Sequence, residues 1–272
     1  IDEPTVKMTI LVNNSPFMGK EGVHCTSRLI LDRLNQELKT NLSLKVEPTS
    51  TPEAFIISGR GELHLSVLLE TMRRELFEFQ VSKPEPVFKK VNNILLEPYE
   101  HLVMDTRQEF LGALTEELVS RLGKFSDMSS NSDGNIRLEY DIPTRGLIGF
   151  RSIFIRITRG NGILNSVFDE FKPKIGEIKL RASGRLVASK NGKAVIFGLL
   201  NSQERGSTFV EPGTDIYEGM IVGMHSRNQD IHVNVCKEKK LTNMRSSTAD
   251  ITKRLSPSIK MTLDESLDFS AI

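Results

Sequence analysis

The stretch that decides the fold of this chain runs from Phe55 to Phe79 and reads FIISGRGELHLSVLLETMRRELFEF. Its first residues are an apolar run that predicts a short strand, Gly59 and Gly61 allow a sharp turn, and the rest has the periodicity of an amphipathic helix. The apolar positions expected to face the core are Leu65, Leu68, Leu69, Met72, Leu76 and Phe79. The polar positions expected to lie largely on the other side are Glu62, Ser66, Glu70, Arg74 and Glu78. The pattern predicts a strand, a turn and a helix, with Arg60 pointing outward at the tip of the turn.

Length and composition restrict the classes of protein to consider. The 272 residues suffice for two to three domains of about 100 residues each. The net charge is only +1, so any affinity for nucleic acid must come from local patches. Cys25 and Cys236 lie far apart, which predicts free thiols in the cytoplasm rather than a disulfide framework. We find no apolar run of the ~18 residues that a membrane span needs and no signal-peptide pattern. The start IDEPTV suggests an excised fragment.

The sequence contains no motif for nucleotide hydrolysis or metal binding. The phosphate-loop pattern G-x-x-x-x-G-K-[ST] is absent, and its nearest approach, at Asn191 to Lys193, lacks the first glycine and the hydroxyl. The five histidines show no metal-ligand spacing. His225 and His232 flank a loop, where a structural role is favoured over a catalytic one. We therefore propose no catalytic residue and no metal site, and expect that this chain alone is not an enzyme.

Residues 1–90 show the pattern of a first α/β sandwich. Alternation over residues 6–12 predicts a half-buried strand, and Ser27 is a good N-cap for the helix that follows. Further strands are predicted over residues 42–46, 54–57 and 81–88, with the helix of the opening stretch before the last of them. The resulting order is βαββαβ, which is the order of the ferredoxin-like sandwich.

Residues 91–174 predict a second sandwich. An extended segment passes through Leu102 and Met104, a helical stripe runs from Leu111 to Leu122, and residues 136–142 alternate as a strand. Residues 143–159 fit both a helix and a strand, and their length and Pro143 favour a helix. A last strand is predicted over residues 163–171, and we assign the order βαββαβ again.

Residues 175–272 lose the helical periodicity and predict a β-rich third domain. Short β-rich runs cover residues 184–188, 194–199, 220–225, 231–235 and 258–261, separated by glycine and proline turns. The segment Thr262 to Glu265 has the form of a capping box and predicts one final short helix. The fold class is therefore α+β, with two consecutive ferredoxin-like sandwiches followed by a β-rich domain.

Four quoted stretches resemble one known family. SGRGELHLSVLLETMRR (residues 58–74) resembles the third domain of the elongation factor G group of ribosomal GTPases, in the form typical of the TypA/BipA family. EPYEHLVMDTRQEFLGALTEELVSRLGKF (97–125) and IPTRGLIGFRSIFIRITRGNGIL (142–164) resemble the fifth domain of the same group. YEGMIVGMHSRNQDIHVNVCKEKKLTNMRSS (217–247) resembles the C-terminal domain specific to TypA/BipA. The resemblance covers essentially the whole chain.

This resemblance implies a function that the residue pattern alone does not give. It implies the C-terminal half of a translational GTPase, whose GTP and Mg²⁺ are bound by an N-terminal domain outside this chain. It also implies a cytoplasmic monomer that binds rRNA and ribosomal proteins at the ribosomal factor site and the acceptor end of a tRNA, without membrane or DNA partners. Ribosome assembly and stress adaptation are the roles associated with the family.

Basic residues supply the candidate RNA contacts. The segment from Lys237 to Arg254 has six Lys or Arg against two Asp or Glu, a local charge of +4. It contains no aromatic residue for base stacking, which favours recognition of RNA shape and backbone. A second and denser cluster, formed by Arg145, Arg151, Arg156 and Arg159, has no matching acids, which favours phosphate contact. The candidate RNA-binding residues are Lys237, Lys239, Lys240, Asn243, Arg245, Arg145, Arg151 and Arg60.

Two alternatives from other classes remain open at this point. The paired sandwiches also suit a stand-alone regulatory protein that binds a small effector, and an apolar cavity of effector size between them would favour that function. The basic segments equally suit an RNA-binding protein unrelated to GTPases.

Overall fold

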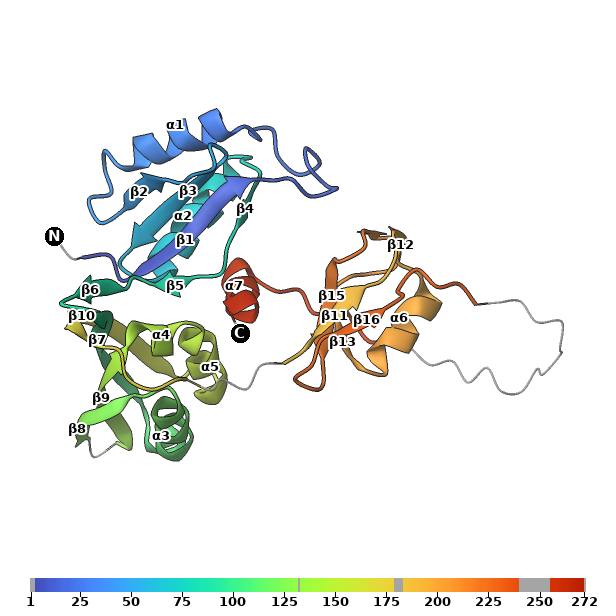
Figure 1. Ribbon diagram of the computed structural model, residues 1–272. Helices are drawn as coiled ribbons and strands as arrows, with labels where there is room; N and C mark the ends of the chain where they lie inside the picture. Colours follow the sequence, from blue (N-terminus) through green and yellow to red (C-terminus); the bar gives the residue numbers. More distant parts are fainter. Residues whose placement is uncertain (1–2, 132, 179–182, 240–254, 272) are drawn as a thin grey trace. The chain divides into compact units, whose positions relative to one another are not determined.

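The computed structural model describes residues 3–131, 133–178, 183–239 and 255–271 and divides the chain into two compact units (Figure 1). The first unit comprises Ile1–Leu180 together with Leu263–Ala271, and the second comprises Arg181–Thr262. Within these described residues, the first unit contains two antiparallel sheets with helices, and the second contains one small mixed sheet, a two-stranded sheet and one helix. The fold is therefore of mixed α and β type, as the sequence predicts.

The first sheet is built from residues before Val87. Its strands are β1 (Val6–Val12), β2 (Lys45–Pro48), β3 (Ala54–Gly59), β4 (Phe79–Val81) and β5 (Glu85–Pro86). The order across the sheet is β2-β3-β1-β4, every pair is antiparallel, and β5 pairs with the start of β1. Helices α1 (Ser27–Glu37) and α2 (Glu62–Arg74) pack against the same hydrophobic core. The predicted order of strands and helices is confirmed for this part of the chain.

Helix α2 presents most of the predicted apolar face to that core. Leu65, Leu68, Leu69 and Met72 are buried, as predicted. The prediction was wrong for Leu76, because the helix ends at Arg74 and Leu76 has a positive φ of 65° with 53% of its surface exposed. It was also wrong for Ser66 and Glu78, which are buried. Ser66 tolerates burial because its hydroxyl donates a hydrogen bond to the Glu62 carbonyl within the helix.

Several boundaries in this part of the chain differ from the predicted ones. The N-cap of α1 is Thr26 rather than Ser27, and the Thr26 hydroxyl accepts a hydrogen bond from the Leu29 N–H. The predicted strand at residues 42–46 is displaced to β2. The predicted strand at residues 81–88 is divided into β4 and β5. The segment contains Pro84 and Pro86, which have no backbone N–H. It therefore lacks two of the donors that one continuous strand would need to pair with its neighbour.

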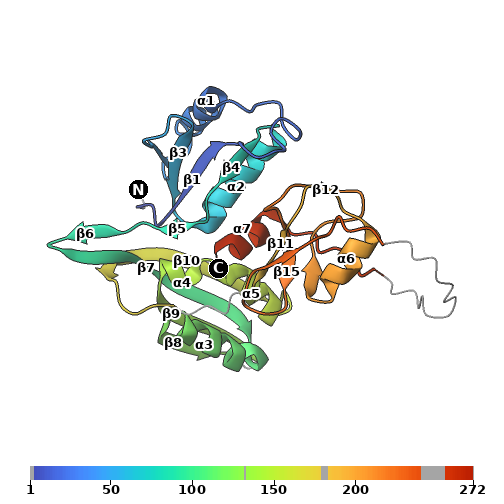
Figure 2. The same cartoon turned by 45° about the vertical axis from the view of Figure 1, so that its right-hand side comes forward.

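The second sheet follows directly along the chain. Its strands are β6 (Lys89–Val91), β7 (Ile94–Arg107), β8 (Lys124–Ser130), β9 (Asn135–Pro143) and β10 (Gly162–Pro173). The order is β10-β7-β9-β8, and β6 pairs with the start of β7 to form a hairpin that projects from the sheet (Figure 2). Its helices are η1 (Gln108–Phe110), α3 (Leu111–Ser120), α4 (Thr144–Leu147) and α5 (Phe150–Ile157). A second core, around Leu102, Tyr140 and Phe150, lies between this sheet and its helices.

Two features of the second sheet differ from the sequence prediction. The single helix predicted over residues 143–159 is two helices, because Gly149 takes a left-handed φ of 72° between α4 and α5. Strand β8 had no apolar alternation by which it could be recognised, since all seven of its residues are exposed.

The final helix, α7 (Leu263–Ala271), confirms the capping-box prediction of a helix at this position. It belongs to the first unit, although it follows the second unit in sequence. Leu267 is buried in the first core, and Leu263 packs against the same core. The apolar side of α7 therefore completes the sandwich that contains α2.

The second unit contains β11 (Arg185–Ala188), β12 (Gly192–Lys193), α6 (Ile196–Gln203), β13 (Gly206–Thr208), β14 (Asp215–Ile216), β15 (Ile221–His225) and β16 (Ile231–Val233). Four strands form a sheet in the order β13-β15-β11-β16, and β12 pairs with β14. The predicted strand at residues 194–199 is wrong, because most of it begins helix α6. Residues 258–261 form no strand either, although the Ile259 N–H donates to the Thr208 carbonyl.

Candidate nucleic-acid interface

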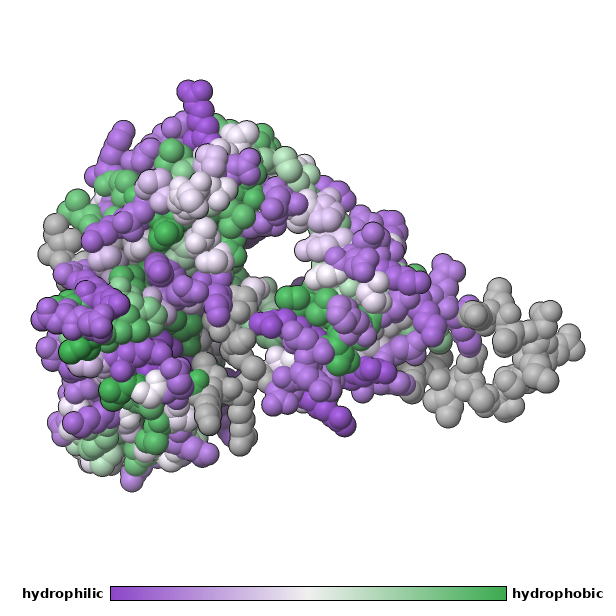
Figure 3. Space-filling model, in the orientation of Figure 1, coloured by the Kyte–Doolittle hydropathy of each residue, from purple (hydrophilic) through white to green (hydrophobic). Residues whose placement is uncertain are grey.

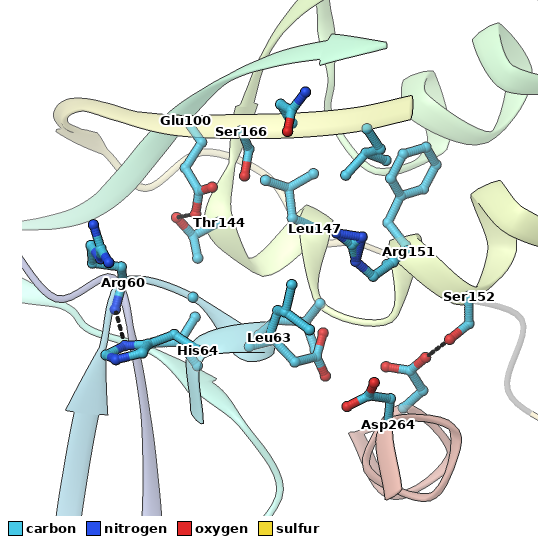
Figure 4. Close-up of a pocket in the computed structure, with 18 residues that line it drawn as sticks. Arg60, Leu63, His64, Glu100, Thr144, Leu147, Arg151, Ser152, Ser166 and Asp264 are labelled. Atoms are coloured by element: carbon cyan, nitrogen blue, oxygen red, sulfur yellow. Dashed lines mark hydrogen bonds between the residues drawn. The ribbon is translucent and has the colours of Figure 1, made fainter. Parts of the chain in front are cut away.

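The first unit contains a cavity of about 280 Å³ between its two sheets. The turn from β3 into α2 forms one wall, and α4, α5 and β10 form the opposite wall (Figure 4). Helix α7 contributes Asp264 and Asp268 to the same cavity. Two of the predicted RNA-binding residues, Arg60 and Arg151, line it from opposite walls. The surface of the first unit in Figure 3 intersperses hydrophilic with hydrophobic residues, without a broad hydrophobic area on the face that is shown.

Arg60 is held at the turn by contacts of its backbone. Its N–H donates to Nδ1 of His64 at 3.2 Å, and its carbonyl accepts from the Thr5 hydroxyl at 2.8 Å. The close approach of His64 also explains Gly59, where a Cβ would lie 2.5 Å from Nδ1 of that ring. Burial lowers the pKa of His64, which favours the neutral ring as an acceptor. The side chain of Arg60 is exposed, as predicted.

Arg151 lies in the first turn of α5 and is half-buried. The break at Gly149 starts this helix in a new direction and so places Arg151 beside the cavity (Figure 4). Arg156 and Arg159, from the same predicted cluster, are exposed on the surface. RNA contact by Arg60 and Arg151 stays a prediction.

Arg145 has a well-defined place within the fold. Its guanidinium forms a bidentate ion pair with Glu97 of β7 and donates to the carbonyls of Ile175 and Gly176, at 2.6 and 3.1 Å. The expectation of a cluster without matching acids was wrong for this residue, because its acid lies 48 positions away in sequence. RNA contact by Arg145 stays a prediction.

The remaining candidates belong to the second unit. Lys237 and Lys239 are exposed on the segment after β16. Lys240, Asn243 and Arg245 lie outside the described residues. The role of all five in RNA binding stays a prediction.

The sequence reasoning missed a group of carboxyl groups at the cavity. Oε2 of Glu62 accepts from the Gly149 N–H at 3.1 Å, and the Ser152 hydroxyl donates to Asp268. Burial, reinforced by the charge of Asp268, raises the pKa of Glu62 to about 8. Burial also raises the pKa of Asp268. The four-residue spacing of Asp264 and Asp268 placed both on one helical face, which was the available signal, but the fold was needed to bring Glu62 to them.

A fourth carboxyl group, that of Glu100, lies deeper at the cavity. Its side chain is buried and accepts a hydrogen bond from the Thr144 hydroxyl at 2.8 Å. Burial raises the pKa of Glu100. Among the described residues, no group of His, Cys, Asp and Glu has the arrangement to hold a metal ion. Across the same residues, no helix is long and apolar enough to cross a membrane.

Comparison with known protein families identifies two domains. Residues 94–181 match the family described as elongation factor G C-terminus, and residues 183–271 match the TypA/BipA C-terminal domain. Together with the α+β fold, these matches define a chain of the elongation factor G-like class.

Curated relatives match almost the entire chain. A protein of Bacillus subtilis named "Large ribosomal subunit assembly factor BipA" is 48% identical over 99% of this chain and 44% of its own length. Proteins with the same name are 49% identical in Synechocystis sp. and 48% identical in Salmonella typhimurium, again over 99% of this chain. The chain belongs to the TypA/BipA family. It spans about half the length of these relatives, 44 to 45%.

Proposed function

We propose that this chain is the ribosome- and RNA-binding portion of a TypA/BipA-like translational GTPase. The observation that carries the proposal is the identity of 48 to 49%, over 99% of the chain, to relatives named as assembly factors of the large ribosomal subunit. The proposed partners are rRNA, ribosomal proteins at the factor-binding site and the acceptor end of a tRNA. The setting is the cytoplasm, in ribosome assembly and stress adaptation, with the protein as a monomer.

The arrangement of charged residues supports this proposal. Arg60 and Arg151 come from two different sandwiches to one cavity, where both can approach one phosphate backbone. In the second unit, Lys237 and Lys239 begin the segment with the local charge of +4. A charged segment of this kind contributes affinity by releasing counterions from RNA, largely independently of base sequence.

The proposal includes a division into three domains, and the family matches over residues 94–181 and 183–271 support the second and the third of them. Residues 1–90 form a domain like the third domain of elongation factor G, residues 91–174 form a domain like the fifth, and residues 175–272 form the domain specific to TypA/BipA. We infer a ferredoxin-like arrangement for the first two, supported by the order β2-β3-β1-β4 in one and β10-β7-β9-β8 in the other. GTP and Mg²⁺ belong, in this proposal, to an N-terminal domain of the whole protein.

Co-sedimentation of the purified chain with ribosomes and with separated large subunits tests the proposal. The chain is expected to pellet with the large subunit at low salt and to dissociate as salt rises, because phosphate contacts release counterions. A chain that stays in the supernatant at every salt concentration would contradict the proposal. Bovine serum albumin in the same tubes controls for trapping in the pellet.

The cavity between the sandwiches favours a second candidate function, the binding of a small effector by a regulatory protein. Its volume of about 280 Å³ is near the lower limit of the range usual for small-molecule sites. Leu63, Leu147 and Phe150 give it an apolar wall, but Glu62, Glu100 and Asp268 make it less apolar than such sites usually are. Measuring the melting temperature of the chain against a library of small metabolites tests this second candidate. The candidate requires that metabolites of one chemical class raise the melting temperature in a saturable way.

A further inference from the structure

Helix α7 is attached to the first unit by an apolar side and a polar side. On the apolar side, Leu263 and Leu267 pack in the core that α2 helps to form. On the polar side, Asp268 accepts a hydrogen bond from Ser152 of α5 and lies beside Glu62 of α2. Figure 4 shows Asp264 on α7 below the cavity and Ser152 pointing toward the helix.

The polar side has more negative groups than donors. Glu62, Asp264 and Asp268 gather there, and the hydrogen-bond donors that the described part of the chain directs to them are the Ser152 hydroxyl and the Gly149 N–H. Oε1 of Glu62 is buried and has no hydrogen-bond partner among the described residues. A proton on Glu62 would reduce the excess of negative charge and would also give the carboxyl group a hydrogen bond, because the protonated group can donate to Asp268.

The cations nearby do not neutralise this group. The charge of Arg121 acts on Asp268, but its guanidinium is already bound to Glu117 and to the carbonyls of Gly146 and Ile148. Arg151 of α5, Arg60 of the β3–α2 turn, His64 of α2 and Glu100 of β7 are the other titratable or charged groups that line the cavity. Among the described residues, Arg151 forms no ion pair with Asp264 or with Asp268.

We propose that α7 is a proton-held cover on the cavity that contains Arg60 and Arg151. A proton between Glu62 and Asp268 keeps the cover closed, and loss of that proton lets α7 leave the first unit. The consequence for RNA rests on the proposed function: α7 places Asp264 and Asp268 in the cavity of the two arginines, so its departure removes negative charge from a surface for phosphate groups.

The direction of the pH effect follows from the raised pKa of Glu62. Burial and the charge of Asp268 raise the pKa of Glu62 to about 8 when α7 is docked. When α7 leaves, Glu62 loses the charges of Asp264 and Asp268 and the burial that α7 provides, so its pKa falls toward the ordinary value. Between these values the docked state binds one more proton than the open state, so opening becomes about tenfold more favourable for each pH unit. Docking is therefore firmest at low pH, weakens as pH rises through the region below about 8 and levels off above about pH 8.

Hydrogen exchange of the α7 amides in the intact chain tests the proposal, with Glu62→Gln as the central variant. A glutamine can still donate to Asp268 and accept from Gly149, but it does not titrate. The exchange rate of wild type divided by that of Glu62→Gln should rise about tenfold per pH unit from about pH 6 to about pH 8 and then level off. Using this ratio at each pH cancels the intrinsic pH dependence of exchange.

Two further variants complete the design. Glu116→Gln removes the same charge from an exposed position on α3 and should follow wild type at every pH. Asp268→Asn removes the other carboxyl group of the pair and should also slow opening at about pH 8, which keeps the proposal testable if Glu62→Gln folds poorly. Equal exchange of α7 in wild type and in both cavity variants across the pH range would overturn the proposal.

RNA binding is read out separately. At about pH 6, Asp264→Asn combined with Asp268→Asn should raise affinity for large-subunit rRNA several-fold, because it removes the charge that the cover places beside the arginines. Unchanged affinity, together with pH-dependent exchange of α7, would leave the proton-held cover in place and overturn its link to RNA. Failure of the whole chain to bind RNA would instead count against the proposed function.

Discussion

Arg145 of α4 and Glu97 of β7 form an ion pair in which the Glu97 side chain is fully buried and the Arg145 side chain is 11% exposed. The pair joins the helix after β9 to the start of the longest strand of the second sheet. The guanidinium also holds the backbone after β10 through Ile175 and Gly176. One arginine thus fixes three segments that are distant in sequence.

Arg145→Ala is therefore expected to destabilise the chain strongly. It leaves Glu97 buried without its counter-charge, and loss of one partner of a buried pair costs about 3–5 kcal/mol. Arg151→Ala, at a half-buried arginine without an ion pair among the described residues, should cost less than about 1 kcal/mol. Chemical denaturation of both variants measures the difference. Similar small losses would show that Arg145 is not structural and would favour its role in RNA contact.

Helix α2 offers a direct test of the core. Leu68→Ala should lower the free energy of unfolding by about 2–5 kcal/mol, because Leu68 is buried against the first sheet. Val67→Ala, one position earlier on the exposed side of the same helix, should cost under about 0.5–1 kcal/mol. Urea unfolding followed by circular dichroism compares the pair, and equal losses would mean that the register of the helix is wrong.

The carboxylate of Glu78 organises the loop before α1. It accepts hydrogen bonds from the N–H groups of Gly19, Glu21 and Gly22 and from the side-chain amide of Asn13. Burial alone would raise the pKa of Glu78, but these four donors together hold it at about 2. The stabilisation is therefore fully present above the ordinary pKa of 4.5 and is lost as pH falls toward about 2.

Glu78→Gln should release this loop at neutral pH, because an amide has only one acceptor oxygen for four donors. Amide exchange at Gly19, Glu21 and Gly22 should accelerate, while exchange in α2 should not change. Glu21→Gln, at an exposed carboxyl group of the same loop, is the control and should leave exchange as in wild type. Protection of the three amides in Glu78→Gln would show that other contacts hold the loop.

The missing phosphate loop leads to a prediction about activity. Purified chain incubated with GTP and Mg²⁺ should release phosphate no faster than buffer, because the sequence lacks the loop and lysine that bind nucleotide phosphates. Malachite-green detection of phosphate measures this. Turnover that increases with chain concentration and survives a second purification would disprove the prediction.

The sequence predicted features that neighbouring residues determine, but it did not predict features that depend on residues far apart in the chain. The buried face of α2 followed from the spacing of Leu65, Leu68, Leu69 and Met72, because that face is set by helical periodicity. Strand β8 gave no such signal, because none of its residues is buried. The break at Gly149 was missed, because Leu147, Phe150 and Phe154 keep apolar spacing on both sides of it.

The candidate site shows the same limit. Arg60 was predicted at an exposed turn from the two glycines around it, a purely local signal. The buried pair of Arg145 with Glu97 and the contact of Glu62 with Asp268 join residues 48 and 206 positions apart, as the residue numbers show. Neither pairing has a local pattern, and only the packed sandwiches and α7 bring these groups together.

The salt dependence of binding to large ribosomal subunits tests the central claim most directly. Each phosphate that the chain neutralises contributes about 0.7–0.9 to the slope of log affinity against log salt. Replacing Lys239, Lys240 and Arg245 together with alanine should flatten the slope by about two to three.

The matched control replaces the exposed residues Lys39, Lys45 and Lys83 of the first unit and should keep the wild-type slope. Melting temperatures confirm that both triple variants are folded. We predict that the wild-type chain binds and that the slope is flattened only in the variant without Lys239, Lys240 and Arg245. Absence of binding by wild type, or parallel slopes with equal affinity in all three proteins, would contradict the assignment of RNA binding to this segment.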